Sequence, residues 1–183
     1  MSKKIKYKCD CCGEVHEEWP ALTFISPDNY NCLDEIEKKN IGSLDNDFCT
    51  IKHEDQVDRF IRCTLTQKVN NYCQDLDYGL WVSLSEKSYL DYENNFNNEV
   101  EEKAYFGWLC NDLSDYDFPE SIPVDVITRK NGGRPNLIPH SNFDHPFVKD
   151  YYNGISKTEA ERRIYKMLEI VRKNEKKWWE IWK

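Results

Sequence analysis

Two cysteines near the start of the chain have the spacing of a metal site. Cys9 and Cys12 are separated by two residues and followed by Gly13. At this spacing both thiolates can face one ion, and the glycine lets the backbone turn so that its amides point at the sulfur atoms. Paired thiolates of this kind select zinc. The string therefore predicts a zinc knuckle in which the metal has a structural role.

The other ligands of that zinc ion must come from elsewhere in the chain. His16 lies four residues after Cys12, and alternation along an extended arm puts both residues on one face, so we expect His16 to be the third ligand. Cys49 is the preferred fourth ligand. Four other residues compete with it: Cys11, Cys32, His53 and His145. A metal-free hairpin stays the alternative, because the second Cys-x-x-Cys pair that is usual in such sites is missing.

The same residue types also suggest an enzyme. Cys49 with His53 or His145 would form a Cys–His pair, as in a small hydrolase that uses either a thiol or a metal ion. His145 has a simpler explanation, in which Asp144 caps a short helix that starts with Pro146 and His145 is a surface residue. No glycine-rich oxyanion turn and no clustered acid–base set accompanies these residues. We therefore expect that the protein is not an enzyme.

Negative charge is concentrated in the middle of the chain. The net charge is −8, and twelve acidic residues stand against two lysines between Asp75 and Glu120. A field of this sign disfavours nucleic acid as a partner of the whole domain and favours a basic protein. The same window holds ten aromatic residues.

We expect the partner to bind at a loop before Pro119, where acids would steer a basic protein and aromatic rings would supply contact area. The residues are Asp112, Asp115, Tyr116, Asp117 and Phe118. The alternative is that the rings pack inward and only the acids face solvent. For Trp81 and Trp108 we expect burial in the core.

Hydrophobic periodicity predicts an α+β fold, with an antiparallel sheet, an N-terminal zinc-knuckle hairpin over residues 5–19 and a long C-terminal helix. The predicted strands are 47–52, 58–66, 78–84, 104–110 and 124–129, and the shorter helices are 31–40 and 86–96. Asn131-Gly132 is typical of a two-residue hairpin turn. Pro135 and Pro139 place the returning strand at a sheet edge, because proline cannot donate a ladder hydrogen bond.

The helix predicted over 157–182 starts with a capping box, in which the Ser156 hydroxyl accepts from a free amide and Glu159 reaches back. An apolar stripe at helical spacing follows. Three tryptophans come last: Trp178, Trp179 and Trp182. We expect them to dock on the core of their own chain, with a partner or a membrane surface as the alternative.

Length and composition indicate a single domain over residues 1–183. A chain of this length can bury one sizeable core, and no Pro/Gly/Ser-rich linker divides it. No export signal is visible and no apolar run is long enough to span a membrane. We therefore expect a cytoplasmic protein with reduced thiols.

Several strings follow one another in a fixed order. They are Cys9-x-x-Cys12-Gly13-x-x-His16, Asp47-Phe48-Cys49, Phe60-Ile61-Arg62, Gly79-Leu80-Trp81-Val82-Ser83, Tyr105-Phe106-Gly107-Trp108, and His145-Pro146-Phe147 with Gly154-Ile155. In this order, over about residues 7–165, the chain resembles an uncharacterised bacterial family called domain of unknown function 2199. The resemblance brings no known activity, but it implies a bacterial protein and marks Cys9, Cys12, His16, Cys49 and His145 as matching positions. Cys11 and the tryptophan-rich tail depart from the family's pattern.

We therefore expect a metal-stabilised, non-enzymatic bacterial interaction protein that binds a basic protein partner. By analogy with other small acidic bacterial proteins, neutralising a basic toxin, as immunity proteins do, is one form that such binding takes. The small metal- or Cys/His-dependent hydrolase stays as the alternative. The sequence leaves the oligomeric state open.

Overall fold

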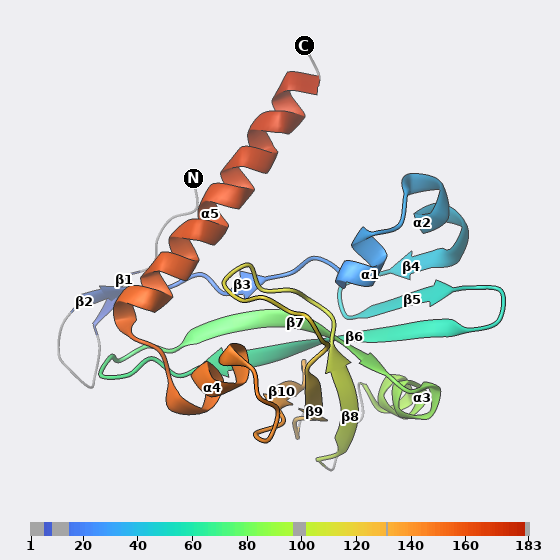
Figure 1. Ribbon diagram of the computed structural model, residues 1–183, viewed down its shortest axis with the longest axis horizontal. Coiled ribbons are helices and arrows are strands. Elements are labelled where there is room, and N and C mark those ends of the chain that lie inside the picture. Colours follow the sequence, from blue (N-terminus) through green and yellow to red (C-terminus); the bar gives the residue numbers. More distant parts are fainter. Residues whose placement is uncertain (1–5, 9–14, 97–101, 131, 182–183) are drawn as a thin grey trace.

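A closed five-stranded barrel forms the centre of the molecule (Figure 1). The computed structural model describes residues 6–8, 15–96, 102–130 and 132–181. The barrel strands are β6 (Val57–Gln67), β7 (Leu76–Leu84), β8 (Ala104–Leu109), β9 (Pro123–Ile127) and β10 (Asn136–Pro139). They pair in the order β6-β7-β8-β9-β10, and β10 returns to β6. The α+β class is confirmed, but the prediction of a simple antiparallel sheet is wrong because the sheet closes on itself.

The closure uses the strand that we expected at a sheet edge. β10 pairs antiparallel with β9 and parallel with β6, where Asn136 lies opposite Thr64. The amide of Thr64 donates to the carbonyl oxygen of Pro135 over 2.8 Å. Proline lacks the amide donor but keeps its carbonyl acceptor. A proline beside β6 is therefore compatible with an interior strand, and the edge prediction is wrong.

The barrel interior follows the alternation that the sequence shows along β6. Ile61, Cys63 and Leu65 are buried and face the apolar side chains of β7, β9 and β10. The other face of β6 and β7 carries Phe60 and Trp81, which are also buried. Around Phe60 and Trp81 these two strands are therefore covered on both faces, as the continuous apolar run Leu80-Trp81-Val82 of β7 requires.

The outer side of β6 and β7 is covered by the segment before β6. The remaining strands and helices before the barrel are β1 (Lys6–Lys8), β2 (Val15–Glu17), β3 (Leu22–Thr23), α1 (Asp28–Asn31), α2 (Glu35–Ile41), β4 (Gly42–Leu44) and β5 (Phe48–Lys52). Cys49, Ile51, Phe60 and Trp81 form a second apolar cluster, against which side chains of α1, α2 and β4 pack. We call this outer unit, residues 24–52, the cap.

The predicted N-terminal hairpin is present as a separate two-stranded sheet. β1 and β2 pair antiparallel, with Tyr7 opposite His16 and Lys8 opposite Val15. Residues 9–14 lie outside the described residues, and the zinc knuckle predicted there lies outside them too.

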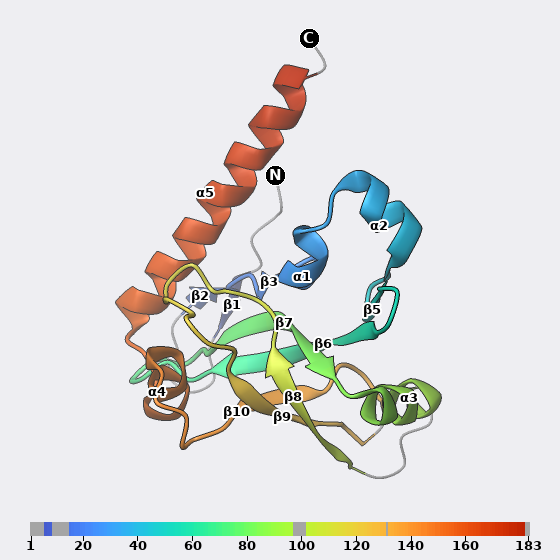
Figure 2. The same cartoon turned by 45° about the vertical axis from the view of Figure 1, so that its right-hand side comes forward.

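Three further helices complete the fold: α3 (Glu86–Asn95), α4 (Pro146–Asn153) and α5 (Lys157–Ile181). α5 begins against the barrel, where Ala160 and Ile164 are buried, and its later turns extend away from it in Figures 1 and 2. The side chains beyond Glu169 lie outside the described part of the structure, so docking of the tryptophans on the core stays a prediction. Among the described residues, no helix combines the length and the apolar character needed to cross a membrane.

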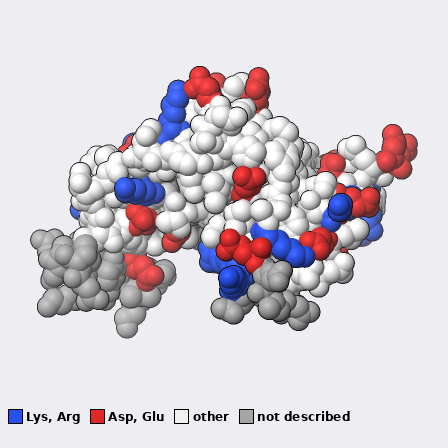
Figure 3. All heavy atoms as spheres, turned by 90° about the horizontal axis from the view of Figure 1, so that it is seen from below, with Lys and Arg blue, Asp and Glu red and all other residues white. Residues whose placement is uncertain are grey.

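Charge is distributed unevenly over the surface. Figure 3 views the molecule from below, on the side where β8, β9 and β10 lie in Figure 1, and much of this face carries neither acidic nor basic side chains. This uncharged area contrasts with the charged residues at its margins.

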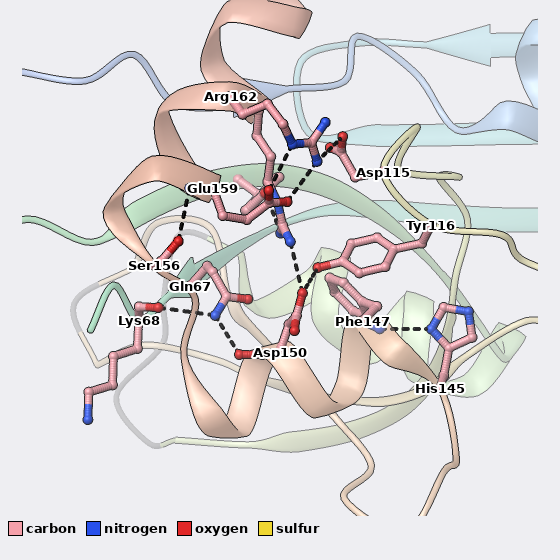
Figure 4. Close-up of polar contacts among 12 residues, drawn as sticks. Gln67, Lys68, Asp115, Tyr116, His145, Phe147, Asp150, Ser156, Glu159 and Arg162 are labelled. Carbon is pink, nitrogen blue, oxygen red and sulfur yellow. Dashed lines mark hydrogen bonds and ion pairs between the residues drawn. The ribbon is translucent and has the colours of Figure 1, made fainter. Parts of the chain in front are cut away.

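A buried arginine joins α5 to the barrel and to α4. The side chain of Arg163 is 2 % exposed and donates to Asp150 Oδ2 over 2.8 Å and to Glu159 Oε1 over 2.8 Å. It also donates to the hydroxyl of Tyr78 over 3.3 Å. Asp150 in turn accepts from the hydroxyl of Tyr116 over 2.6 Å, so α4, α5 and the loop after β8 meet at one carboxylate (Figure 4).

Neighbouring contacts reinforce this junction. The Ser156 half of the predicted capping box is present, because the Ser156 hydroxyl accepts from the Glu159 amide over 3.1 Å. The Glu159 carboxylate accepts from Arg162 and Arg163, and these hydrogen bonds lower its pKa to about 2. Gln67 of β6 donates from Nε2 to the carbonyl oxygen of Asp150 over 2.7 Å. Strand β6 is thereby tied to α4 at the same point.

Replacing the buried arginine should therefore destabilise the protein far more than replacing its neighbour. Arg163→Met leaves two carboxylates without their buried cation and should lower the free energy of unfolding by about 3–5 kcal/mol. Arg162→Met is the matched control: its side chain is 50 % exposed, and the loss should be about 1 kcal/mol or less. Urea denaturation measures both values. Equal losses would show that Arg163 does not hold the junction.

Candidate binding surface

Strand β8 exposes two aromatic rings on the outside of the barrel. Its residues alternate between inside and outside, so Tyr105 and Leu109 are buried while Phe106 is 49 % and Trp108 is 43 % exposed. The Phe106 and Trp108 rings lie 5.2 Å apart in edge contact. Burial is confirmed for Trp81 but wrong for Trp108, because the pleat of β8 turns position 108 outward.

A glycine between the two rings fixes how β8 lies on β7. A Cβ atom on Gly107 would be 2.4 Å from Val82 Cγ1 and 2.7 Å from the carbonyl oxygen of Ser83. Only glycine permits this approach without displacing β7. The close packing holds the backbone on both sides of Gly107, and with it the outward positions of Phe106 and Trp108.

A groove of about 1040 Å³ lies beside this aromatic pair. Phe106 and Trp108 line it together with parts of β6, β7, α1 and the loop after β8. Its charged lining consists of four acids and one base: Asp28, Asp58, Asp112, Glu120 and Arg59. Arg59 is itself paired with Glu86 at the start of α3. The groove therefore combines exposed aromatic rings with a surplus of negative charge.

The edge of the groove is built by contacts between the cap and the loop after β8. Asp28 Oδ2 accepts from the amide of Asp112 over 2.7 Å, and its Oδ1 accepts from Asn111 Nδ2 over 3.3 Å. Asn111 is buried, and its Oδ1 accepts from the amide of Trp81 over 2.8 Å. Burial raises the pKa of Asp112, and the charges of Asp28 and Asp117 raise it further. A cation bound at this edge would relieve the repulsion among these carboxylates.

The five residues predicted to bind a partner all lie in the loop after β8, but their side chains go to different places. Asp112 lines the groove, and Asp117 is exposed. Asp115 is paired with Arg162 over 3.0 Å and with Lys166 over 3.1 Å. Tyr116 and Phe118 pack against the core. Three of the five thus serve contacts within the chain.

Sequence reasoning missed the aromatic pair and most of the acids of the groove. The alternation of β8 carried a usable signal, because inward Tyr105 and Leu109 require outward Phe106 and Trp108. No comparable signal joins the acids, since Asp28, Asp58 and Glu120 come from three separate parts of the chain.

Of the four predicted zinc ligands, the structure describes the side chain of Cys49 alone. Cys9 and Cys12 lie outside the described residues, as does the side chain of His16. Cys49 lies on β5, at the opposite end of the molecule from β1 and β2 in Figure 1. Among the described residues, no three His, Cys, Asp or Glu side chains gather as a metal site would require.

His145 is a buried cap and not a surface residue. It is 5 % exposed, and its Nδ1 accepts from the amide of Phe147 over 3.1 Å at the start of α4. Its Nε2 lies 2.7 Å from the carbonyl oxygen of Asp117, so both ring nitrogens are engaged. Asp144, which we expected to cap this helix, is exposed and paired with Lys149. The His145 ring also stacks on Phe118, so the residue that caps α4 packs inside the protein.

Cys49 is not paired with either candidate histidine. Its side chain is 1 % exposed within the second apolar cluster, and burial raises its pKa to about 12. His53 contacts Asp58 over 3.0 Å, and His145 has the partners given above. Neutral pH therefore leaves Cys49 as a thiol, which is a poor nucleophile.

Alkylation should distinguish Cys49 from an exposed cysteine of the same chain. At pH 8, iodoacetamide should label exposed Cys32 at least about a hundredfold faster than Cys49, because the reactive species is the thiolate. Peptide mass spectrometry after timed quenching measures both rates, and in urea the two rates should converge. Fast labelling of Cys49 in the native protein would instead support the thiol hydrolase.

A comparison with protein families identifies one match. A family model described as an uncharacterized protein conserved in bacteria, domain of unknown function 2199, covers residues 8–155. Curated proteins and solved structures gave no match. The matched region contains the barrel, the cap, the groove and α4. The chain therefore belongs to this family of bacterial proteins.

Proposed function

We propose that this protein is a non-enzymatic interaction module that binds a basic segment of a protein partner in the groove beside β8. One observation supports this above all others. Phe106 and Trp108 stand half-exposed on a groove whose charged lining has four acids and a single, already paired, arginine.

Each part of this surface has a distinct physical effect on binding. Aromatic side chains supply much contact area at little conformational cost, and tryptophan is enriched among the residues that dominate binding energy. Acidic groups attract a basic partner and speed its association. The groove thus resembles an interface with an aromatic centre and a charged rim.

The sheet surface next to the groove supports a contact larger than the groove alone. The outward positions of β9 and β10 that neighbour Phe106 include Pro123, Ile127 and Ile138. Asp125 is the acid among them, and it contacts His140 over 3.1 Å. Figure 3 shows the resulting low density of charge on this side. A partner would therefore cover an apolar area at little desolvation cost.

Toxin neutralisation is a narrower form of this proposal. It adds that the bound partner is a basic enzyme and that occupation of the groove blocks its activity. The groove chemistry supports the basic character of the partner and leaves its identity to experiment.

Binding of a basic probe should depend on salt and on Trp108. A fluorescent peptide of eight arginines should bind the protein and lose affinity as salt shortens the Debye length toward ~8 Å at physiological ionic strength. Trp108→Ala should weaken binding by about tenfold or more, as loss of a dominant aromatic contact does. Fluorescence anisotropy measures both effects.

Tyr165→Ala provides the control for this experiment. Tyr165 is 66 % exposed on α5 and does not line the groove, so its replacement should leave the affinity unchanged. If Trp108→Ala binds the peptide as the parent protein does, the aromatic pair is not the binding site.

We also propose that Cys9 and Cys12 bind a structural zinc ion with His16 as a third ligand. The Cys-x-x-Cys spacing supports this, as does the antiparallel pairing of β1 with β2, the strands before and after the cysteines in the sequence. Cys49 is buried in the second apolar cluster and both ring nitrogens of His145 are engaged, so the candidates for the fourth ligand are Cys11, Cys32 and His53.

Metal analysis tests the zinc proposal directly. Protein purified without chelator should contain about one zinc per chain, and Cys12→Ser should lose it and melt at a lower temperature. Cys32→Ser tests one candidate for the fourth ligand and should lose the metal only if Cys32, on the exposed end of α1, is that ligand. Elemental analysis that finds no zinc in the parent protein would refute the proposal.

A further inference from the structure

The chain itself contains a segment with the chemistry that the groove selects. Residues 170–183 hold five basic residues against two acidic ones, and three tryptophans. The body of the protein is acidic, since the whole chain carries a net charge of −8. A basic, aromatic segment and an acidic, aromatic groove are thus both present in one polypeptide.

The path of α5 keeps this segment away from the groove of its own chain. Figures 1 and 2 show the last turns of α5 on the opposite side of the barrel from β8. The first turns are fixed by the buried side chain of Arg163, which binds Asp150 and Tyr78. A continuous helix from Lys157 to Ile181 cannot fold back to β8 without breaking. The groove of a second molecule is not subject to this constraint, because α5 can reach it without bending.

We propose that the groove beside β8 binds residues 170–183 of a second copy of this chain. This inference rests on the proposed function and names the partner that the groove binds. The basic residues of the segment lie against the acids of the groove, and its tryptophans pack on Phe106 and Trp108. Reciprocal exchange between two copies gives a closed dimer, and one-way binding gives a longer assembly.

Two acids of the groove are available for this contact. Asp112 and Glu120 are exposed, and neither forms an ion pair with the residues that the structure describes. Asp28 is instead committed to the loop through its bonds to Asn111 and Asp112. Asp112 and Glu120 are therefore the positions at which charge can be reversed without removing a contact that holds the groove.

A charge exchange tests the pairing. Full-length protein should exceed the monomer mass in sedimentation velocity, and low salt should favour the larger species. Asp112→Lys with Glu120→Lys should weaken self-association by about tenfold or more, and so should Lys176→Glu with Lys177→Glu. A mixture of these two double variants should recover the association, because each then offers the charge that the other lacks.

The control reverses two acids away from the groove. Glu18 lies beside the N-terminal hairpin, and Asp77 lies six residues before Ser83 on β7, roughly 20 Å along the strand. Glu18→Lys with Asp77→Lys makes the same change in net charge and should leave self-association unchanged. If this control loses as much self-association as the groove variant does, net charge alone explains the effect and the proposed pairing is wrong.

Further outcomes separate this inference from the proposed function. A synthetic peptide of residues 170–183 should compete with self-association and should bind in a manner that depends on Trp108. If the eight-arginine peptide binds and this peptide does not, the inference fails while the proposed function stands. If neither binds, both fail. The inference also fails if the full-length protein is monomeric. It fails as well if Trp108→Ala leaves self-association intact, because that result would point to pairing of α5 with α5.

Discussion

The burial of one guanidinium group organises much of this molecule. Arg163 is removed from water, and a buried charge is tolerated only where carboxylates and hydrogen-bond acceptors surround it. Its acceptors come from α4, from α5 itself and from β7. These elements cannot move independently without leaving that charge unpaired. The direction of α5 and the position of α4 beside the barrel follow from this constraint.

The same constraint extends to the loop that borders the groove. Tyr116 donates to the carboxylate that binds Arg163, and its ring lies beneath the guanidinium at 4.9 Å. Asp115, the residue before it, accepts from Arg162 and Lys166 of α5. One end of the loop is thus anchored on α5, and the other is anchored by Asp28 on the cap. Two acids of the groove, Asp112 and Glu120, are thus presented by a loop that is anchored at two points.

Local patterns in the sequence predict the elements well and the closure poorly. The period of two along β6 and the apolar run of β7 identify both strands, because these signals lie within a few consecutive residues. The pairing of β10 with β6 joins positions about seventy residues apart, and no local pattern encodes it. Pro135 misled the prediction, because the rule concerns its missing amide, whereas the closure uses its carbonyl oxygen.

In the candidate surface too, local features follow from the sequence and contacts between distant residues do not. Residue type predicts a core position for Trp108, although the pleat of its own strand requires an outward position once Leu109 faces inward. The sequence neighbours of His145 predict a surface position, whereas the residue is buried against Phe118, which comes from a different loop. The four acids of the groove lie near one another in the folded protein, but no sequence pattern links them. Residue type and spacing therefore located the strand and the loop but not the groove between them.

The cap has a consequence for the dynamics of the groove. Its buried residues Cys49 and Ile51 pack on the outer face of the barrel, in a cluster separate from the barrel interior, so we expect the cap to open as a local unfolding unit while the barrel remains closed. Because Asp28 belongs to this unit and fixes the edge of the groove, each opening event would also release the loop at Asp112. A ligand in the groove would then slow hydrogen exchange within β4 and β5, which it does not touch, since it stabilises only the closed form. Binding at the groove and opening of the cap would then be one coupled equilibrium, because both depend on the contact between Asp28 and Asp112.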